Sequence, residues 1–180
     1  MIHALAFAAI SLDGRLTGPD EDLSFLERYV DPLDDMGFSA VLQRADALVM
    51  GRRTWDAIHR FEPWPYGALP LRVRTSRPLP SPHGERPVSG SIAAILSALA
   101  EEGAQTVYVD GGETVRDALR EGVLDELVLT LVPEVLGAGV PLFAEGLPPS
   151  TWRLAGLRTR ADGLLQGRWL RADARPVTAG

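Results

Sequence analysis

The sequence Leu48-Val49-Met50-Gly51-Arg52-Arg53-Thr54 predicts a short buried strand, a glycine turn and the start of a helix. A second stretch repeats this arrangement, Tyr108-Val109-Asp110-Gly111-Gly112-Glu113-Thr114. A helix start offers unpaired N–H groups and the positive end of the helix dipole, and a glycine lets a ligand approach the backbone. Open α/β sheets bind ligands at the carboxyl ends of their strands, so the two turns predict a phosphate site. Ordinary turn chemistry beside solvated arginines is the alternative.

The rest of the sequence predicts strands that alternate with helices until a final antiparallel pair. Strands are expected at residues 2–10, 47–50, 71–75, 106–109 and 124–132, and helices at 22–30, 38–44, 54–59 and 114–120. Another helix is expected between an N-cap at Ser91 and a C-terminal cap at Gly103. Residues 152–160 and 164–171 predict a hairpin. This order predicts a three-layer α/β/α fold, with a mostly parallel sheet and an antiparallel C-terminal edge hairpin. One domain is expected over residues 1–172, with a flexible tail at 173–180.

The composition excludes several kinds of chemistry. The chain has 180 residues and no Cys, which excludes thiol nucleophiles, Cys-based zinc sites and disulfides. All 18 basic residues are Arg, which excludes a Schiff-base lysine and a Walker A lysine. The histidines His3, His59 and His83 share no metal-ligand spacing, so no metal is expected. We therefore expect the reactivity to come from a bound cofactor.

The charge balance and the apolar pattern bear on partners and location. A formal net charge of −6 argues against nucleic acid, because phosphate binding needs clustered basic residues. The sequence contains no apolar run as long as a membrane span and no signal-peptide pattern at its start. We therefore expect no nucleic-acid or membrane partner and a cytoplasmic location.

Residues 51–58 carry a resemblance to a known family. Gly51-Arg52-Arg53-Thr54-Trp55-Asp56-Ala57-Ile58 resembles the dihydrofolate reductase motif Gly-Arg-x-Thr-Trp-Glu-Ser-Ile, in which the Arg and Thr bind cofactor phosphates. Thr75-Ser76-Arg77 resembles the family segment that contacts the adenosine 2′-phosphate, and Asp110-Gly111-Gly112 resembles its turn under the nicotinamide and pyrophosphate. Ala8-Ala9, Asp13-Gly14 and Leu129-Thr130 also match in order. The resemblance implies the dihydrofolate reductase-like fold and NADPH as cofactor.

Three segments favour one branch of that superfamily. Residues 11–14, 109–112 and 133–143 resemble the reductase domain of riboflavin-pathway deaminase-reductases. In that domain NADPH reduces the ribosyl group of a phosphoribosylamino pyrimidine. The Cys residues of the zinc deaminase domain are absent, so a stand-alone member is expected. The resemblance implies an NADPH-dependent reductase similar to 5-amino-6-(5-phosphoribosylamino)uracil reductase, acting on a pyrimidine or pterin-type small molecule, and a homodimer. A dihydrofolate or pterin reductase is the alternative, and a non-catalytic nucleotide-binding protein of the same fold is the second.

The resemblance also assigns roles in cofactor binding. Arg52 and Ser76 would hold the 2′-phosphate, which selects NADPH over NADH. Thr54 and the Gly111–Gly112 turn would hold the pyrophosphate, and Ala9 with the Asp13 loop would border the nicotinamide. The full set of expected cofactor-binding residues is Ala9, Asp13, Gly14, Gly51, Arg52, Arg53, Thr54, Thr75, Ser76, Arg77, Gly111, Gly112, Glu113 and Thr114.

The proton source has two acidic candidates. Asp22 aligns with the pterin-binding carboxylate of dihydrofolate reductases, with Thr130 as its neighbour, and shielding in a pocket would raise its pKa. An acid at a helix start is also an ordinary cap. Asp110 matches a substrate-binding position that is usually Glu in the riboflavin branch.

One position speaks against folate as the substrate. Leu69 stands where dihydrofolate reductases carry the Arg that grips the folate carboxylate. Strand alternation places Arg72 and Arg74 on one face, where they could compensate for it, bind a substrate phosphate or be solvated.

Overall fold

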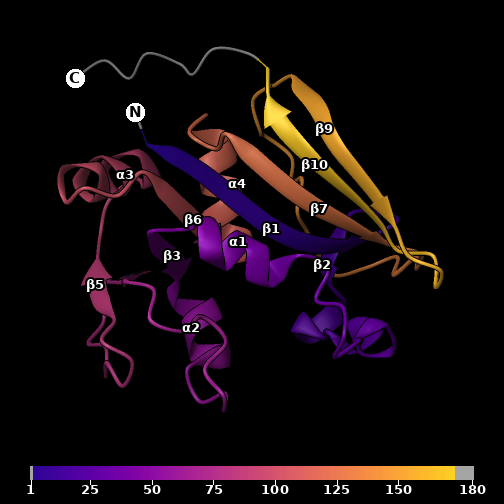
Figure 1. Cartoon of the computed structure of the whole chain (residues 1–180), viewed down its shortest axis with the longest axis horizontal. Coiled ribbons are helices and arrows are strands. Elements are labelled where there is room, and N and C mark those ends of the chain that lie inside the picture. The colour runs from indigo at the N-terminus through magenta and orange to yellow at the C-terminus, as the bar shows by residue number, and fades with distance from the viewer. Residues whose placement is uncertain (1, 173–180) are drawn as a thin grey trace.

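The computed structural model describes residues 2–172 (Figure 1). The predicted tail at 173–180 lies outside the described residues. Within the described part, eight strands form one sheet in the order β5-β4-β3-β6-β1-β7-β10-β9. These strands are β1 (His3–Ser11), β3 (Ala47–Gly51), β4 (Leu71–Arg74), β5 (Arg86–Val88), β6 (Thr106–Asp110), β7 (Glu126–Val132), β9 (Trp152–Thr159) and β10 (Leu165–Arg171). A separate two-stranded sheet pairs β2 (Arg15–Thr17) with β8 (Val140–Pro141).

The strand directions confirm the predicted sheet. Every neighbouring pair from β5 to β7 is parallel. The strand β10 pairs antiparallel with β7 and with β9. The expected antiparallel hairpin therefore forms the C-terminal edge, and β9 is its outer strand.

Side chains that alternate along the strands build two apolar layers. In β3, Leu48 and Met50 belong to a core cluster with α1 (Phe38–Arg44) and α2 (Arg52–Ile58). Val49 belongs to a second cluster with α3 (Ile92–Glu101) and α4 (Gly112–Arg120). Successive residues of a strand point to opposite faces, so one strand supplies both layers. Figure 1 shows α1 in front of the strands and α4 behind them, which confirms the three-layer α/β/α fold. Within residues 2–172, no helix has the length and apolar character needed to cross a bilayer.

Some local predictions were wrong. The expected helix at 22–30 is a short 3-10 helix, η2 (Ser24–Tyr29), in which Phe25 is the buried residue, and another, η1 (Pro19–Glu21), precedes it. So little apolar surface cannot stabilise a regular amphipathic helix. The strands β2, β5 and β8 were not predicted, because each has only two or three residues and shows no periodicity.

The expected caps of α3 are confirmed. The Ser91 side chain accepts a hydrogen bond from the Ala94 N–H, and Gly103 has φ +100°. The Glu121 carboxylate accepts hydrogen bonds from the N–H groups of Ile92 and Ala93 at 3.1 and 2.7 Å. The N-terminus of α3 is therefore already supplied with acceptors from within the chain.

Glu126 connects four elements at the amino ends of the parallel strands. It begins β7 and is fully buried. Its carboxylate accepts two hydrogen bonds each from Arg44 and Arg168, at 2.7–3.0 Å, and lies 3.0 Å from His3 Nε2. Burial alone would raise the pKa of Glu126, but the hydrogen bonds from Arg44, His3 and Arg168 outweigh it and hold that pKa well below its usual 4.5. The charged carboxylate therefore ties α1, β1 and β10 to β7.

We predict that Glu126→Gln lowers the free energy of unfolding by about 3 kcal/mol near neutral pH, because two guanidinium groups lose their carboxylate. The pKa of Glu126 is lowered by folding, so its contribution is present above the unfolded value of 4.5 and is lost as the pH falls below it. Urea unfolding of both proteins near neutral pH and at about pH 3 measures this, and the difference is expected to shrink in acid. The control is the exposed Glu101→Gln, with an effect within about 0.5 kcal/mol. A difference that is unchanged in acid would contradict this assignment.

Candidate functional site

The two glycine turns interlock at the carboxyl ends of adjacent strands. Residues 50 and 110 are partners in the parallel pairing of β3 with β6, so Gly51 and Gly111 are neighbours. A Cβ atom on Gly111 would lie 2.1 Å from Thr54 Oγ1, and one on Gly51 would lie 3.0 Å from Thr114 Oγ1. The threonine of each turn therefore packs against the glycine of the other turn. Gly111 also has φ +87° and ψ +136°, a conformation that favours glycine.

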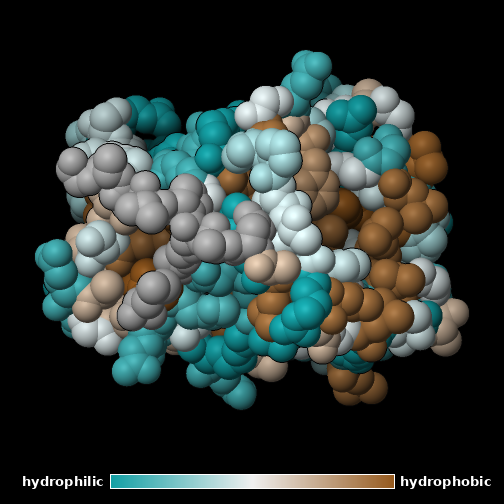
Figure 2. Space-filling model, turned by 90° about the horizontal axis from the view of Figure 1, so that it is seen from above, coloured by the Kyte–Doolittle hydropathy of each residue, from teal (hydrophilic) through white to brown (hydrophobic). Residues whose placement is uncertain are grey.

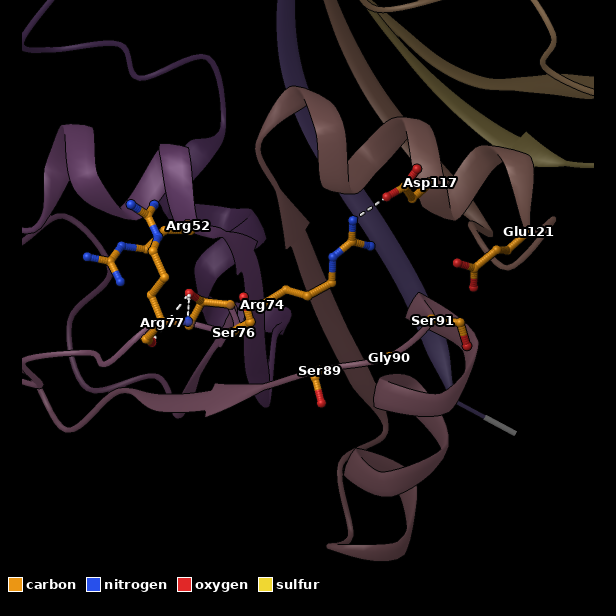
Figure 3. Close-up of a pocket in the computed structure, with 10 residues that line it drawn as sticks. Arg52, Arg74, Ser76, Arg77, Ser89, Gly90, Ser91, Asp117 and Glu121 are labelled. Carbon is orange, nitrogen blue, oxygen red and sulfur yellow. Dashed lines mark hydrogen bonds and ion pairs between the residues drawn. The ribbon is translucent and has the colours of Figure 1, made fainter.

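A cavity of about 540 Å³ opens beside the end of β4 (Figure 3). Four of the predicted cofactor-binding residues line it: Arg52, Thr75, Ser76 and Arg77. Figure 3 shows Arg52 and Arg77 at one side and Arg74 reaching toward Asp117 on α4 at the other. Arg74, one of the arginines considered for a substrate phosphate, also lines the cavity, and the remaining lining residues were not predicted as site residues: Ser89, Gly90, Ser91, Asp117 and Glu121.

Asp56 holds two of the three arginines that line the cavity, Arg52 and Arg77. The Arg52 Nε atom donates to Asp56 Oδ1 at 2.8 Å, and Arg77 Nη2 lies 3.6 Å from Asp56 Oδ2. Arg52 also donates to the Pro78 carbonyl at 2.9 Å and stacks over the buried Trp55 ring at 5.0 Å. Two guanidinium groups are thus oriented beside the hydroxyl groups of Thr75 and Ser76. This donor set suits a phosphate monoester, because several N–H and O–H donors can share its oxygens.

The acidic groups at the other end of the cavity already have partners. Asp117 accepts hydrogen bonds from Arg74 and Arg120, and Glu121 accepts them from the start of α3. The charge of the cavity is therefore uneven, with the two arginines held by Asp56 at one end and Asp117 and Glu121 at the other.

The other predicted cofactor residues lie around the turns or in nearby loops. Thr54, Gly112 and Thr114 belong to the interlocked turns, whereas Arg53 and Glu113 are exposed, and Arg53 pairs with Glu21. Ala9 lies on β1, partly exposed.

The Asp13 carboxylate binds within its own loop region. It accepts hydrogen bonds from Ser11 Oγ at 2.6 Å and from the N–H groups of Leu136 and Gly137 at 3.0 and 2.9 Å. The bond from Ser11, followed by those from the backbone, holds the pKa of Asp13 well below its usual value. Asp13 therefore joins the turn at Gly14 to the loop that precedes β8.

Asp110 is the acidic side chain whose surroundings disfavour its charge. Burial raises the pKa of Asp110, although hydrogen bonds from Tyr66, Gly111 and Tyr108 act in the opposite direction. The residue ends β6 and is partly exposed as a whole. Tyr66 was not predicted, because it comes from an irregular loop without periodicity.

The structure places Asp22 and Thr130 with different partners. Asp22 is exposed and accepts hydrogen bonds from Ser24 Oγ at 2.7 Å and Ser24 N–H at 3.0 Å. These bonds lower the pKa of Asp22, so the expected rise was wrong. Thr130 is buried on β7 and accepts a hydrogen bond from Gln166 Nε2 at 2.8 Å.

Leu69, which stands where dihydrofolate reductases carry an Arg, has an apolar environment in the structure. Leu69 packs against the core cluster of α1 and α2. Arg72 pairs with Glu102 and Arg74 with Asp117, so both lie on the α3 and α4 side of the sheet, as predicted. Tyr108 belongs to the other cluster, and Asp110 shares its face. Neither arginine therefore supplies a charged group on the face of Asp110.

Comparison with known proteins gives the family. Residues 87–166 match the RibD C-terminal domain model. The uncharacterized protein YwjB of Bacillus subtilis is 30% identical over 156 residues, which are 84% of this chain and 88% of YwjB.

Solved structures agree with this relationship. A protein from Shewanella sp. PV-4, provisionally named for riboflavin biosynthesis, is 33% identical, with a TM-score of 0.86 over 96% of this chain and 100% of its own. Dihydrofolate reductase from Enterococcus faecalis, complexed with NADP(H), is 17% identical, with a TM-score of 0.67 over 95% of this chain and 97% of its own, which shows a shared fold. With its interlocked glycine turns on a dihydrofolate reductase-like sheet, this chain belongs to the RibD C-terminal domain family.

Proposed function

We propose that this chain is an NADPH-dependent reductase that transfers a hydride to a pyrimidine or pterin-type substrate, similar to 5-amino-6-(5-phosphoribosylamino)uracil reductase, which reduces the ribosyl group of its substrate. The observation that carries the proposal is the cavity in which Arg52, Arg77 and Ser76 converge beside the interlocked turns. Membership of the RibD C-terminal domain family supports it.

The residues present fit the proposed cofactor. Arg52 and Arg77, oriented by Asp56, would hold the 2′-phosphate with the hydroxyl group of Ser76. The turn at Gly111 and Gly112 would receive the pyrophosphate, because it forms the N-terminus of α4, where backbone N–H groups and the helix dipole favour an anion. NADPH, when bound, would supply the hydride.

Asp110 is the favoured proton donor of the two acidic candidates. A general acid near neutral pH needs a raised pKa, and Asp110 has one whereas the pKa of Asp22 is lowered. Asp110 also directly precedes the glycine turn at which the pyrophosphate is proposed to bind. Asp22 is exposed on a loop, and its role is that of a local cap for the backbone of Ser24.

The face of Asp110 favours a planar heterocycle without a folate tail. Phe38 packs against both Tyr66 and Tyr108 there, with ring centroids 6.0 and 6.3 Å apart. Leu69 contributes no charge to grip a tail carboxylate. A pyrimidine is therefore preferred to dihydrofolate.

A homodimer through the C-terminal hairpin is part of the proposal. Leu154, Leu157 and Leu165 of β9 and β10 are exposed, and β9 has an unpaired edge. Figure 2 shows apolar residues gathered at the right of the molecule, the side on which Figure 1 shows the hairpin. A second copy would cover this apolar surface.

We predict that Arg52→Ala weakens NADPH binding roughly 10- to 100-fold and leaves NADH binding within about twofold, because only NADPH offers the 2′-phosphate. Titration followed by tryptophan fluorescence measures both constants. Arg153→Ala is the matched control, since Arg153 is exposed on β9 at the far side of the sheet. If neither nucleotide binds the wild type below about millimolar concentration, the reductase proposal fails.

We predict that Asp110→Asn slows NADPH oxidation with 5-amino-6-(5-phosphoribosylamino)uracil by roughly 10²- to 10⁴-fold while NADPH still binds. Asp22→Asn is expected to change the rate by less than about threefold, because its carboxylate is exposed and serves a local turn. The reverse order would restore Asp22 as the acid. Faster turnover of dihydrofolate would favour a pterin reductase, and tight NADPH binding without turnover of either compound would favour a non-catalytic protein.

We predict that Leu157→Arg converts the dimer to a monomer, because it places a charge in the apolar surface of β9. Light scattering gives the molar mass. Leu23→Arg, at a similarly exposed leucine outside the hairpin, is the control and is expected to stay dimeric. A monomeric wild type would refute the dimer.

A further inference from the structure

Three donors from three backbone positions meet at the Asp110 carboxyl. The Tyr66 hydroxyl donates to Oδ2, the Tyr108 hydroxyl donates to Oδ1 at 3.2 Å, and the Gly111 N–H donates to Oδ1 at 2.8 Å. Tyr108 and Gly111 belong to the same strand end as Asp110, but Tyr66 is 44 residues away in sequence. A separate loop is thus folded so that its phenol reaches one carboxyl oxygen.

Aromatic packing fixes the Tyr66 ring. Tyr66 is 8% exposed and lies between Phe38 and Trp64, with ring centroids 6.0 and 5.2 Å from its own. The Tyr108 ring is 6.3 Å away. A ring held on several sides loses little further freedom when its hydroxyl donates a hydrogen bond. The position of the phenol is therefore set by the fold.

The groups that face Asp110 bring no positive charge. Its own strand supplies Tyr108 and the loop supplies Tyr66, which are the ionisable groups in contact with it. The paired position on β3 is Met50, β1 contributes the Phe7 carbonyl beside the Tyr108 hydroxyl, and α1 contributes Phe38. No charged residue is among the causes of the pKa shift of Asp110. A negative charge on this carboxyl is therefore stabilised by hydroxyl and N–H dipoles alone.

We propose that Tyr66 is a positioning residue for proton transfer, which holds the Asp110 carboxyl in place and, with Tyr108, stabilises the negative charge that forms as Asp110 releases its proton. This inference rests on the proposed function. Donors that are oriented before the reaction stabilise a developing charge without reorganisation, as in other preorganised sites.

The proton balance of the step is complete. The heteroatom of the reduced double bond takes the proton of Asp110 as its carbon gains the hydride of the proposed function. The O–H bond of Asp110 breaks, an N–H or O–H bond forms on the substrate, and water then returns a proton to the carboxylate. Tyr66 keeps its own proton throughout, because burial, with the neighbouring Asp110, raises the pKa of its phenol far above its usual value.

The first test measures the titration of Asp110 directly. Carboxyl carbons are followed by NMR in protein labelled with ¹³C at aspartate, and Asp110→Asn identifies the signal. Tyr66→Phe keeps the ring and removes the hydroxyl, so the pKa of Asp110 is expected to rise by roughly one unit. Tyr108→Phe, which leaves the loop of Tyr66 intact, is expected to raise it as well. Tyr29→Phe is the matched control, because Tyr29 donates to a different carboxylate, that of Glu134, and is expected to leave Asp110 unchanged.

The second test measures turnover of 5-amino-6-(5-phosphoribosylamino)uracil. Tyr66→Phe is expected to lower the maximal rate roughly tenfold with unchanged NADPH affinity. The rate falls as Asp110 loses its proton with rising pH, so a higher pKa moves that fall to higher pH. The inference is overturned if Tyr66→Phe leaves the pKa of Asp110 unchanged. It is also overturned if Tyr29→Phe shifts that pKa by the same amount. Failure of the wild type to bind NADPH would instead defeat the proposed function, so the two failures are distinguishable.

Discussion

The reciprocal contact between two threonines and two glycines sets the geometry on which the site depends. Thr54 fills the space beside Gly111, and Thr114 fills the space beside Gly51. The ends of β3 and β6 and the starts of α2 and α4 are therefore held against one another. Arg52 directly follows Gly51 and lines the cavity, and Asp110 directly precedes Gly111. The relative positions of Arg52 and Asp110 are thereby set by backbone that has no room for a side chain.

Two buried carboxyl groups of this fold have opposite electrostatic surroundings. Glu126 is surrounded by two arginines and a histidine, which hold it charged in spite of its burial. Asp110 meets two phenols and one N–H, and burial keeps its charged form unfavourable. Their pKa values are therefore displaced in opposite directions. The parallel strands separate the two groups, because Glu126 stands at an amino end and Asp110 at a carboxyl end.

Sequence reasoning worked where the signal is local. The helix at 38–44 and the capped helix after Ser91 were confirmed, because hydrophobic periodicity and helix caps depend only on residues close together in the sequence. The glycine turns were visible as strand, glycine and helix start, but their interlocking depends on strand order and was not. Asp22 had an aligned position, yet the sequence did not show that it is exposed between two short 3-10 helices. No sequence pattern indicated the role of Tyr66, because its hydrogen-bond partner Asp110 lies 44 residues away and its loop shows no hydrophobic periodicity.

The separation of Glu126 from Asp110 has a consequence for the evolution of the chain. In the proposed function, substitutions near Asp110 would alter which ligand is accepted, while the hydrogen-bonded cluster around Glu126 that joins α1, β1, β7 and β10 lies at the opposite ends of the strands. Mutations at sites that share no partners act almost independently on stability. Changes of substrate preference can therefore accumulate in this fold without crossing the threshold of unfolding, and related chains can diverge in activity while they retain one architecture.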